Sequence, residues 1–592
     1  MKMDMKNLLK YTAFAAVLLL SAPSCDYLDK REETDGLSIE EVFGNANNYE
    51  LYVEWMIQNP ILQYLQNGLH PHGSWDDISD NSMSTANFVV PCLVVAQGDF
   101  WTMISHGNCV MSNENVWTRI WKHVRIANMG LKYIDMYPGD EAGRNKILGT
   151  CYFYRAFAYF EACRRWGGMP YFLEPFEDLS ENFDRERDDM RTTYLNIAND
   201  FAEAAKYLEP VIDVTEWQHP TSVAALAMRS RALLYAASPQ ATEEGGQTRE
   251  DLWEEAALAA DEAIKAAEDN GYELVPESEY YYIFKGQNTD TYTKEVLFGR
   301  RHKINWGSDA YKATIRPPGK LDGLYGVATN QKFVDCFDMA NGYPIDDPDS
   351  GYDPQNPYVN RGSRFEHDII HNGSEPYPGY KMDLYNQVQH ADGSITLGGG
   401  DISYDGGSVR DGYTTTGTYG KKWMGDQWNT ALDQVWPYIR IAELYLNFSE
   451  AAAEAGWSAT DSHGCRYTPL EALNMVRNRG GIADLPAKYQ SGDLFLERIR
   501  NERRVELCFE DHRFFDIRRW KIGTTTDQHI YRVLITKLEG EYDTAAYPTG
   551  YRYEEDTAPV LRRTYEERHY LFPIKREDTY LGPLFKQNPG WE

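Results

Sequence analysis

Two blocks of helical periodicity, with a long stretch between them that lacks it, most constrain how this chain can fold. Apolar residues recur at three- and four-residue steps across residues 37–270 and again across 433–520, as in helices that bury one face. Residues 271–432 lose this period and are rich in Gly, Pro, Asn, Asp and Tyr, and residues 521–592 are irregular as well. The sequence therefore predicts a mainly α-helical protein with a large irregular, loop-rich insertion packed on it.

Local signals place the ends of several helices. Ser38 and Glu41 have the spacing of a capping box, and so have Thr468 and Glu471, with Pro469 at the first helical position. Helices are predicted from residue 38 toward 66, over 115–137, 146–166, 190–208, 222–237 and 248–267, from 435 onward, and over 492–518. Paired helices of this length are typical of a helical-hairpin solenoid, although no clean repeat of about 34 residues is visible.

The N-terminus has the form of an export signal. Three Lys residues precede the apolar run Tyr11–Leu20, and small residues at 21–24 lead to Cys25. The apolar run is about half of the ~20 residues that a membrane span requires. A Cys directly after small residues resembles the lipobox of bacterial lipoproteins, which implies cleavage before Cys25 and lipid attached to its sulfur. An ordinary secretory signal with an incidental Cys is the alternative. Residues 1–24 are therefore predicted as a removed signal peptide and 25–36 as a lipidated tether.

Charge and motif content exclude several classes of function. The net charge of −31 disfavours nucleic acid and anionic lipid as partners, because binding phosphates takes patches of Lys and Arg. The eight Cys have no CxxC spacing, so neither a zinc site nor a disulfide framework is indicated. Cys92 and Cys109 flank one loop, and a bond between them stays open. HExxH, GxSxG and P-loop motifs are missing from the sequence, and we predict no catalytic residue, metal ligand or cofactor.

Two charged motifs invite a functional interpretation, but a structural one is favoured. The acidic cluster Asp346, Asp347, Asp349 and Asp353 lacks the spacing of an EF-hand, so a solvated loop is preferred over a calcium site. The run of Glu and Arg at 502–519 suggests a charged active site. We interpret it instead as a buried helix that ties the insertion to the solenoid through paired charges.

Aromatic residues that lie in loops, rather than on helical stripes, form the predicted ligand surface. Phe, Trp and Tyr make up 14% of the chain; most of them must lie in the core, and a surplus in loops would provide stacking surfaces for ligands. A sugar ring has an apolar face that suits a flat aromatic ring and a rim of hydroxyls that suits Asp, Asn or Arg. The predicted ligand-binding residues are Trp75, Asp76, Asp77, Trp101, Trp306, Tyr311 and Tyr325. A third aromatic group at 404–428 is a weaker candidate.

Four stretches, in order along the chain, carry a resemblance to a known family. They are Arg155–Phe160 with Arg165–Pro170, Tyr352–Tyr358, Glu502–Leu507 with Glu510–Trp520, and the closing Leu571–Ile574 with Gln587–Trp591. Behind a lipobox, this set resembles the SusD/RagB family of outer-membrane nutrient-binding lipoproteins of Bacteroidetes, over essentially the whole chain after the signal. Asp26 and Asp29 are similar to the acidic signal that sends such lipoproteins to the cell surface.

The resemblance implies both a fold and a function. The fold is a solenoid of four tetratricopeptide-like hairpins with an irregular half packed on it, as a single domain over residues 37–592. The function is that of a lid on a TonB-dependent outer-membrane transporter of the SusC type, which captures oligosaccharide and delivers it without covalent chemistry. In the RagB branch the ligand is peptide. A helical surface glycoside hydrolase, and a lid that binds nothing alone, stay open as alternatives.

Overall fold

A computed structural model describes most of the chain from residue 38 to residue 592. The residues outside this description are 1–37, 63–74, 86–94, 96, 102–112, 177–183, 213–217, 243–248, 286–293, 305–316, 322, 324–325, 399–400, 403, 406–407, 410–411, 425–431 and 581. Cys25, Cys92 and Cys109 therefore lie outside the described residues. None of the helices in the described part has both the length and the apolar character that crossing a membrane requires.

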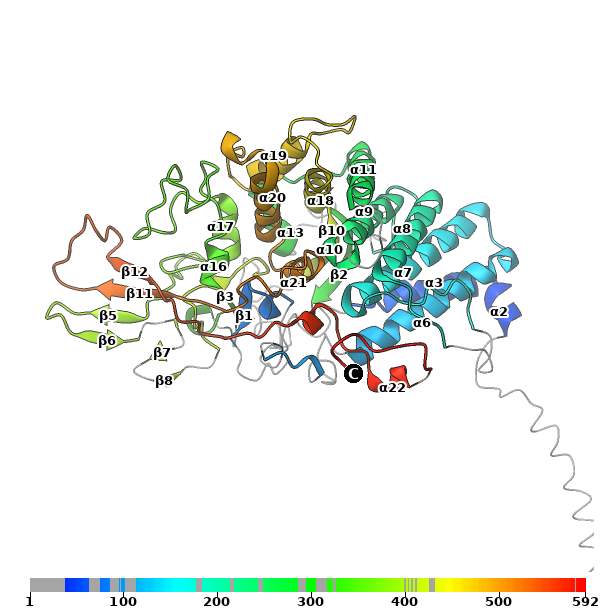
Figure 1. Cartoon of the computed structure of the whole chain (residues 1–592), viewed down its shortest axis with the longest axis horizontal. Coiled ribbons are helices and arrows are strands. Elements are labelled where there is room, and N and C mark those ends of the chain that lie inside the picture. Colours follow the sequence, from blue (N-terminus) through cyan, green and yellow to red (C-terminus); the bar gives the residue numbers. More distant parts are fainter. Residues whose placement is uncertain are drawn as a thin grey trace, which may run out of the picture.

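Stacked helices form one side of the molecule (Figure 1). Before the insertion they are α2 (Ile39–Phe43), α3 (Ala46–Gln58), α6 (Asn113–Lys132), α7 (Glu141–Trp166), α8 (Met190–Tyr207), α9 (Ser222–Ala237), α10 (Pro239–Thr242) and α11 (Arg249–Asp269). After it they are α18 (Ile441–Glu454), α19 (Pro469–Arg479), α20 (Gly492–Glu506) and α21 (Arg513–Arg519). Consecutive helices from α6 to α9 pack on each other, α9 packs on α11, and α11 packs on α18. The stack thus continues across the insertion, which confirms the predicted mainly α-helical solenoid.

Helix caps follow the local sequence closely. The Ser38 hydroxyl accepts from the Glu41 N–H at 3.2 Å, and the Glu41 carboxylate accepts from the Ser38 N–H at 2.8 Å. Thr468 and Glu471 make the same pair of bonds at the start of α19, at 3.1 and 2.8 Å. Each box satisfies backbone donors that a helix start leaves without intrahelical partners. Both predicted capping boxes are therefore confirmed.

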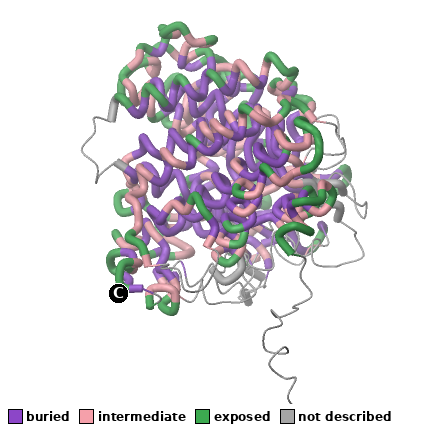
Figure 2. The backbone as a smooth tube through the Cα atoms, turned by 90° about the vertical axis from the view of Figure 1, so that its right-hand side faces the viewer, coloured by how far each residue is buried: buried purple, intermediate pink, exposed green. Residues whose placement is uncertain are grey.

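Helix α7 runs through the interior of the stack, with few exposed positions from Ile147 onward. Figure 2 shows buried backbone filling the inside of the helical part, with exposed residues around its periphery. A helix that is apolar on all sides has to be buried. The charge that it carries inward is paired, because Arg155 donates two hydrogen bonds to Asp200, each of 2.7 Å, and one to Asn128. The motif Arg155–Phe160 therefore packs in the core, where the charge of Arg155 is paired with Asp200.

Two of the predicted helices are each divided into two shorter helices in the structure. The first breaks at Gly44 and resumes with Asn45 as the cap of α3, which ends at Gln58 rather than near residue 66. The last divides into α20 and α21, because Phe509 and Asp511 have positive φ values of 59° and 65°. A helix cannot continue through residues in the left-handed region.

The residues before α18 form a strand where a helix had been predicted from 435 onward. Strand β10 (Leu432–Arg440) pairs antiparallel with β2 (Val296–Ile304), with a bulge at Pro437. Proline has no N–H for the ladder and sits at such irregularities. The surrounding Val435, Trp436 and Ile439 favour extended backbone once a partner strand is present. The helical block after the insertion therefore begins at Ile441 rather than at 433.

The insertion, predicted as irregular, folds together with segments from before and after it into short strands and single helical turns. One four-stranded sheet has the order β1 (Ser82–Ser84), β3 (Val327–Thr329), β9 (Tyr419–Gly420), β4 (Ile369–Ile370). Another has the order β12 (Tyr551–Glu555), β11 (Val533–Leu538), β5 (Gln387–Gln389), β6 (Ile395–Leu397), and it projects at the end away from the solenoid (Figure 1). A two-stranded ribbon joins β7 (Tyr404–Asp405) to β8 (Ser408–Val409).

The short helices are η1 (Asp76–Ile78), η2 (Ile134–Met136), α12 (Glu277–Tyr280), α13 (Tyr282–Lys285), η3 (Gly319–Leu321), α16 (Gln331–Val334), α17 (Ser363–Asp368), η4 (Ala487–Tyr489), η5 (Glu567–Tyr570) and α22 (Arg576–Thr579). Strands of two or three residues carry almost no periodic signal, which explains why they were not predicted from the sequence.

Buried ion pairs join the insertion to the solenoid. The fully buried carboxylate of Glu506, on α20, lies 2.6 Å from Arg364 of α17 and 2.6 Å from Arg440 of β10, and it also pairs with Arg479 of α19. Arg440 in turn contacts Glu295 at 2.8 Å. Charges taken out of water are tolerated only when they are paired in this way. The predicted structural role of the Glu and Arg run at 502–519 is confirmed.

The acidic loop near residue 350 also carries a structural pairing. Lys488 contacts Asp347 at 2.5 Å and Asp349 at 3.1 Å, and the hydroxyl of Tyr489 donates to Asp347. Two of the four carboxylates are thus held by one ammonium group. The other two, Asp346 and Asp353, are exposed to solvent.

Candidate ligand-binding cleft

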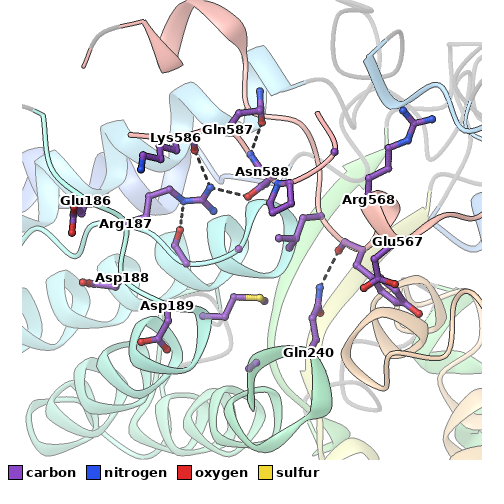
Figure 3. Close-up of a pocket in the computed structure, with 18 of the residues that line it drawn as sticks. Glu186, Arg187, Asp188, Asp189, Gln240, Glu567, Arg568, Lys586, Gln587 and Asn588 are labelled. Atoms are coloured by element: carbon purple, nitrogen blue, oxygen red, sulfur yellow. Dashed lines mark hydrogen bonds between the residues drawn. The ribbon is translucent and has the colours of Figure 1, made fainter. Parts of the chain in front are cut away.

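A cleft of about 780 Å³ opens where the C-terminal segment meets the helical stack. Its walls come from the end of α7, the chain leading into α8, the short helix α10 and the segment from Glu567 to Gly590 (Figure 3). The C-terminal segment is separated from the other three parts by more than 300 residues in the sequence. The volume lies within the range of about 300–1,000 Å³ that is usual for small-molecule sites.

Two side chains join the cleft walls at the end of α7. The Arg187 guanidinium donates to the carbonyls of Trp166 and Gly168 and, at 2.7 Å, to the side-chain oxygen of Asn588 (Figure 3). The Asn588 amide donates to the carbonyls of Trp166 at 2.9 Å and Phe572 at 2.7 Å. The last carbonyls of a helix have no intrahelical partners. Arg187 and Asn588 supply those partners from two distant segments.

The glycines after α7 allow this close approach. Gly167 has a φ of +83°, which favours glycine, and a Cβ on Gly168 would lie 1.8 Å from the carbonyl oxygen of Asp188. The two motifs that contain Gly167, Gly168 and Asn588 therefore meet at one joint, and they explain why the cleft has its walls at these positions.

Carboxylates face the cleft from the chain that leads into α8. Glu186 is exposed, and Asp188 is half-buried. Burial raises the pKa of Asp188, partly offset by a backbone hydrogen bond from Tyr171. Asp189 caps α8 by accepting from the Thr192 N–H at 2.8 Å. This wall therefore offers hydrogen-bond acceptors, of which Asp189 is already occupied by the helix.

Cations and amides face the cleft from the other walls. Lys521 pairs with Glu567 and lies 4.2 Å from the centroid of the Tyr570 ring. Gln240 donates to the Tyr570 carbonyl at 3.0 Å (Figure 3), and Lys586 is exposed at the rim. The cleft lining therefore contains negatively charged acceptors, positively charged donors and neutral amides, and it exposes little aromatic surface. Such a lining suits a ligand with many hydroxyl or amide groups.

The predicted stacking residue Trp75 does not face solvent. Only 3% of its surface is exposed, and its ring packs 4.8 Å from that of Phe514, 5.2 Å from Phe515 and 5.9 Å from Phe572. The prediction of an exposed stacking face on Trp75 is therefore wrong. The residue directly precedes η1 and has the sequence setting of a loop aromatic, but α21 and the C-terminal segment cover it.

The acids beside Trp75 are buried as well. Asp76 accepts from the Asn81 amide at 2.9 Å, and Asp77 accepts from the Ser82 hydroxyl at 3.1 Å. Neighbouring Asp80 takes a two-point contact from Arg513, at 2.7 and 2.8 Å. The expectation that Asp76 and Asp77 hold ligand hydroxyls is contradicted, because both carboxylates are used to fold the η1 turn and both are buried.

Trp101 lies elsewhere, beside the C-terminal segment. It is half-buried, its ring meets that of Trp591 edge-on at 6.2 Å, and the Arg576 guanidinium lies 5.1 Å from its centroid. Its contact with ligand stays a prediction. Trp306, Tyr311 and Tyr325 lie outside the described residues.

Sequence reasoning missed the cleft itself. Its residues come from polar connecting segments, such as Glu186 and Arg187, and from the closing motif around Asn588. The signal was present in that motif, because an Asn before Pro589-Gly590 is a residue type that bonds backbone groups at turns. What the sequence lacked was the pairing of this motif with the end of α7.

Comparison with known proteins gives consistent matches. A model described as the SusD family matches residues 282–591, and one described as "Starch-binding associating with outer membrane" matches residues 26–234. The chain is 24% identical over 439 residues to SusD-like protein P2 of Formosa agariphila, covering 70% of this chain and 74% of that protein. It is 30% identical over 95 residues to SusD-like protein P38 of the same organism, covering 16% and 18%.

Solved structures extend the likeness over almost the whole chain. A SusD-like protein from Bacteroides fragilis NCTC 9343 is similar with a TM-score of 0.67 at 24% identity, covering 94% of this chain and all of that one. A SusD-like carbohydrate binding protein from the same strain has a TM-score of 0.67 at 19% identity, covering 92% of this chain and 100% of that one. At these identities the likeness shows a shared fold.

Proposed function

The chain belongs to the SusD family, and from this premise we propose that it is a lipid-anchored outer-membrane protein that captures oligosaccharide at the cell surface. It then delivers the oligosaccharide to a partner TonB-dependent transporter of the SusC type, without covalent chemistry. The anchor is Cys25, at the end of a signal that resembles a lipobox. Two or more acyl chains hold a protein on a membrane where one chain alone is marginal.

The observation that carries this proposal is the cleft between the solenoid and the C-terminal segment. Its size suits a short stretch of oligosaccharide. Its carboxylates, amides and cations match the donors and acceptors of sugar hydroxyls. The names of similar proteins support the same ligand class, since one is a SusD-like carbohydrate binding protein and one matching model is described as starch-binding. The aromatic loops with Trp306, Tyr311 and Tyr325 are proposed to add stacking surfaces.

The buried carboxylates support binding rather than catalysis. Burial raises the pKa of Asp76 to about 6, and paired arginines lower that of Glu506 against the effect of burial. Strong shifts of this kind often mark active sites. Here both groups hold segments of the fold together and neither lines the cleft.

Peptide is the second candidate ligand. The cleft presents carboxylates, Glu186 and Asp188, and cations, Lys586 and Arg568, within one lining. Such a combination suits the amino and carboxylate groups of a peptide as well as the hydroxyls of a sugar. The loop aromatics favour sugar over peptide.

The test measures binding by the full lipoprotein, purified in detergent micelles. Isothermal titration uses maltoheptaose, laminarihexaose, xylohexaose and an oligogalacturonide on one side, and a tryptic peptide mixture on the other. We expect at least one oligosaccharide to bind and the peptides not to bind. Chromatography of the same glycans after long incubation should show them unchanged. A cleavage product would overturn the binding assignment in favour of a glycoside hydrolase.

The transporter step needs a separate measurement. An affinity tag on the lipoprotein should recover a large TonB-dependent transporter from solubilised outer membranes of the native host. Recovery of the lipoprotein alone, at low detergent and physiological salt, would contradict the delivery role.

A further inference from the structure

Five half-buried aromatic residues, which we call the aromatic band, form a continuous group along α6. The ring centroid of Trp117 lies 6.3 Å from that of Phe585 and 5.3 Å from that of Trp121. The Trp121 ring lies 6.1 Å from Phe172, which in turn lies 5.0 Å from Phe176. All five residues are partly open to solvent. Single exposed apolar residues are common, but a contiguous group of them marks an interaction site.

Two exposed leucines extend the aromatic band into a larger apolar patch. Leu173 is 58% exposed and Leu584 is 40% exposed. Each directly adjoins a residue of the band in the sequence, Phe172 and Phe585 respectively. Leu584 also lines the cleft. The patch therefore begins at the edge of the cleft and continues from there over α6.

Hydrogen bonds fix the segment that carries Phe172, Leu173 and Phe176 on the helical stack. The Asn128 amide donates to the Phe172 carbonyl at 2.9 Å, and the Arg125 guanidinium donates to the Phe176 carbonyl at 2.7 Å. Both donors belong to α6. A surface that is ordered before binding loses little conformational entropy when a partner covers it.

The edge of the patch is polar. Arg125, Arg185 and Glu174 are exposed there, and the Arg185 guanidinium lies 5.4 Å from the centroid of the Phe172 ring. Neither arginine pairs with a carboxylate among the residues that the structure describes. An apolar centre of Trp, Phe and Leu with arginine at its edge is the composition of a protein–protein interface. The net charge of −31 disfavours an anionic lipid surface as the occupant.

The patch lies at the end of the stack where the chain enters the described structure. Ser38 caps α2, helix α2 packs on α3, and α3 packs on α6; Figure 1 shows these three helices together at one end of the molecule. The 12 residues between Cys25 and Ser38 can span no more than about 45 Å when fully extended. A lipid anchor at Cys25 therefore keeps this end close to the outer membrane, where a transporter lies.

We propose that the aromatic band, together with Leu173 and Leu584, is the surface that docks on the transporter. The inference rests on the proposed function and adds to it the place where the two proteins meet. A transporter docked here borders the cleft at Leu584, so ligand can pass between the two proteins without release into bulk solvent. The matching surface of the transporter presents apolar side chains to the band and carboxylates to Arg125 and Arg185.

Photo-crosslinking of the full-length lipoprotein in cells of the native host tests the contact directly. A photoreactive benzoylphenylalanine in place of Leu173 should give an adduct whose peptides, identified by mass spectrometry, belong to a TonB-dependent transporter. The same residue in place of Leu258, which is 47% exposed on α11, is the matched control and should give no such adduct.

Affinity recovery from solubilised membranes gives a second measurement. The double variant Leu173→Asp, Arg185→Glu should recover about tenfold less transporter than the unmutated protein, or lower still, as expected for disruption of an interface centre. Leu258→Asp should recover as much as the unmutated protein. Neither Leu173 nor Arg185 lines the cleft, so glycan affinity and the melting temperature of the double variant should be unchanged.

The outcomes separate the docking surface from the wider function. If the unmutated protein recovers the transporter and the double variant recovers as much, the docking surface is wrong and the proposed function stands. If the unmutated protein recovers no transporter, the delivery role and the docking surface both fall. An adduct at position 173 with lipid only, or with a second copy of this chain, also overturns the docking surface.

Discussion

Asp76 and Asp511 bind each other's backbone segments, although 435 residues separate them. The Asp511 N–H donates to Oδ2 of Asp76 at 3.3 Å, while Oδ1 of Asp511 accepts from the N–H of Trp75 at 3.2 Å. Both carboxyls are buried. Burial raises the pKa of Asp76 to about 6 and raises that of Asp511 well above its ordinary range, and the Asp76 carboxyl adds to the shift at Asp511. Arg164 and Arg165 oppose the shift at Asp511.

This pair should make stability fall as pH rises through weakly acidic values. The folded protein keeps a proton on Asp76 up to about pH 6, whereas the unfolded chain releases it near 3.8. The stabilisation is therefore complete below the unfolded value and is lost as pH rises through the folded one. Between pH 5 and 7 the free energy of unfolding should fall by roughly 1–2 kcal/mol from this group. Urea titrations across this range measure it.

Asp76→Asn provides the matched comparison for the pH prediction. Its amide does not titrate, so the dependence of stability on pH between pH 5 and 7 should lose the negative contribution of Asp76. The exposed Asp353→Asn should keep the slope of the unmutated protein. Equal pH slopes for Asp76→Asn and the unmutated protein would contradict a raised pKa at Asp76, because buried histidines such as His123, whose pKa burial lowers to about 4, contribute to both slopes alike.

The charge of Glu506 should be needed for the fold. Glu506→Gln leaves Arg364, Arg440 and Arg479 without their common carboxylate in a buried site. Breaking a buried pair by removing one partner costs about 3–5 kcal/mol, and urea unfolding measures the loss. Glu203→Gln is the control, because Glu203 and Lys206 form an exposed pair worth under about 1 kcal/mol. Equal effects of the two substitutions would contradict a structural role for the buried network.

Substitution of Trp75 should lower stability, whereas substitution of Trp306 should lower glycan affinity. Trp75→Ala removes a ring packed against Phe514, Phe515 and Phe572 and should cost about 3–5 kcal/mol of stability. Trp306→Ala, in a loop predicted to bind ligand, should leave the melting temperature unchanged. It should weaken glycan affinity by about ten- to hundredfold. Thermal melts and titration of both variants are the measurements, and normal glycan affinity in Trp306→Ala would rule out the loop platform.

Cys25 should carry the lipid anchor. Only its thiol can take the lipid, so Cys25→Ala should lose radiolabelled palmitate and leave the membrane fraction. Cys465→Ala, which changes a cysteine of the folded body, should keep both the label and the membrane location. Undiminished labelling of Cys25→Ala would show that the resemblance to a lipobox is incidental.

Local interactions explain what could be predicted from the sequence. The capping boxes at Ser38 and Thr468 are made within four residues, so their spacing alone identifies them. Helical periodicity is similarly local, and it predicted the solenoid. The charged run around Glu506 could be assigned a structural role because a helix with buried charges needs partners, even though the partners themselves were unknown.

Long-range packing explains what could not be predicted. Trp75 sits in a short non-helical segment, like an exposed loop aromatic, and only its contacts with Phe514 and Phe572 bury it. Val435–Arg440 form a strand because β2, more than 130 residues earlier, lies beside them (Val435 pairs with Arg301). The cleft depends on Arg187 and Asn588, which are 401 residues apart. No window of sequence contains both members of such a pair.

The joint between Arg187 and Asn588 also sets the order in which the molecule can be completed during biosynthesis. Helix α7 ends at Trp166, but the partners of its last carbonyl include Asn588, which the ribosome adds some 400 residues later. Until then that carbonyl must be satisfied by water or by another partner, and the cleft has no outer wall. A chain truncated before this point would lack the outer wall of the cleft even where its helices had formed. A measurement of ligand bound in the cleft would therefore count only chains that are both fully synthesised and fully folded.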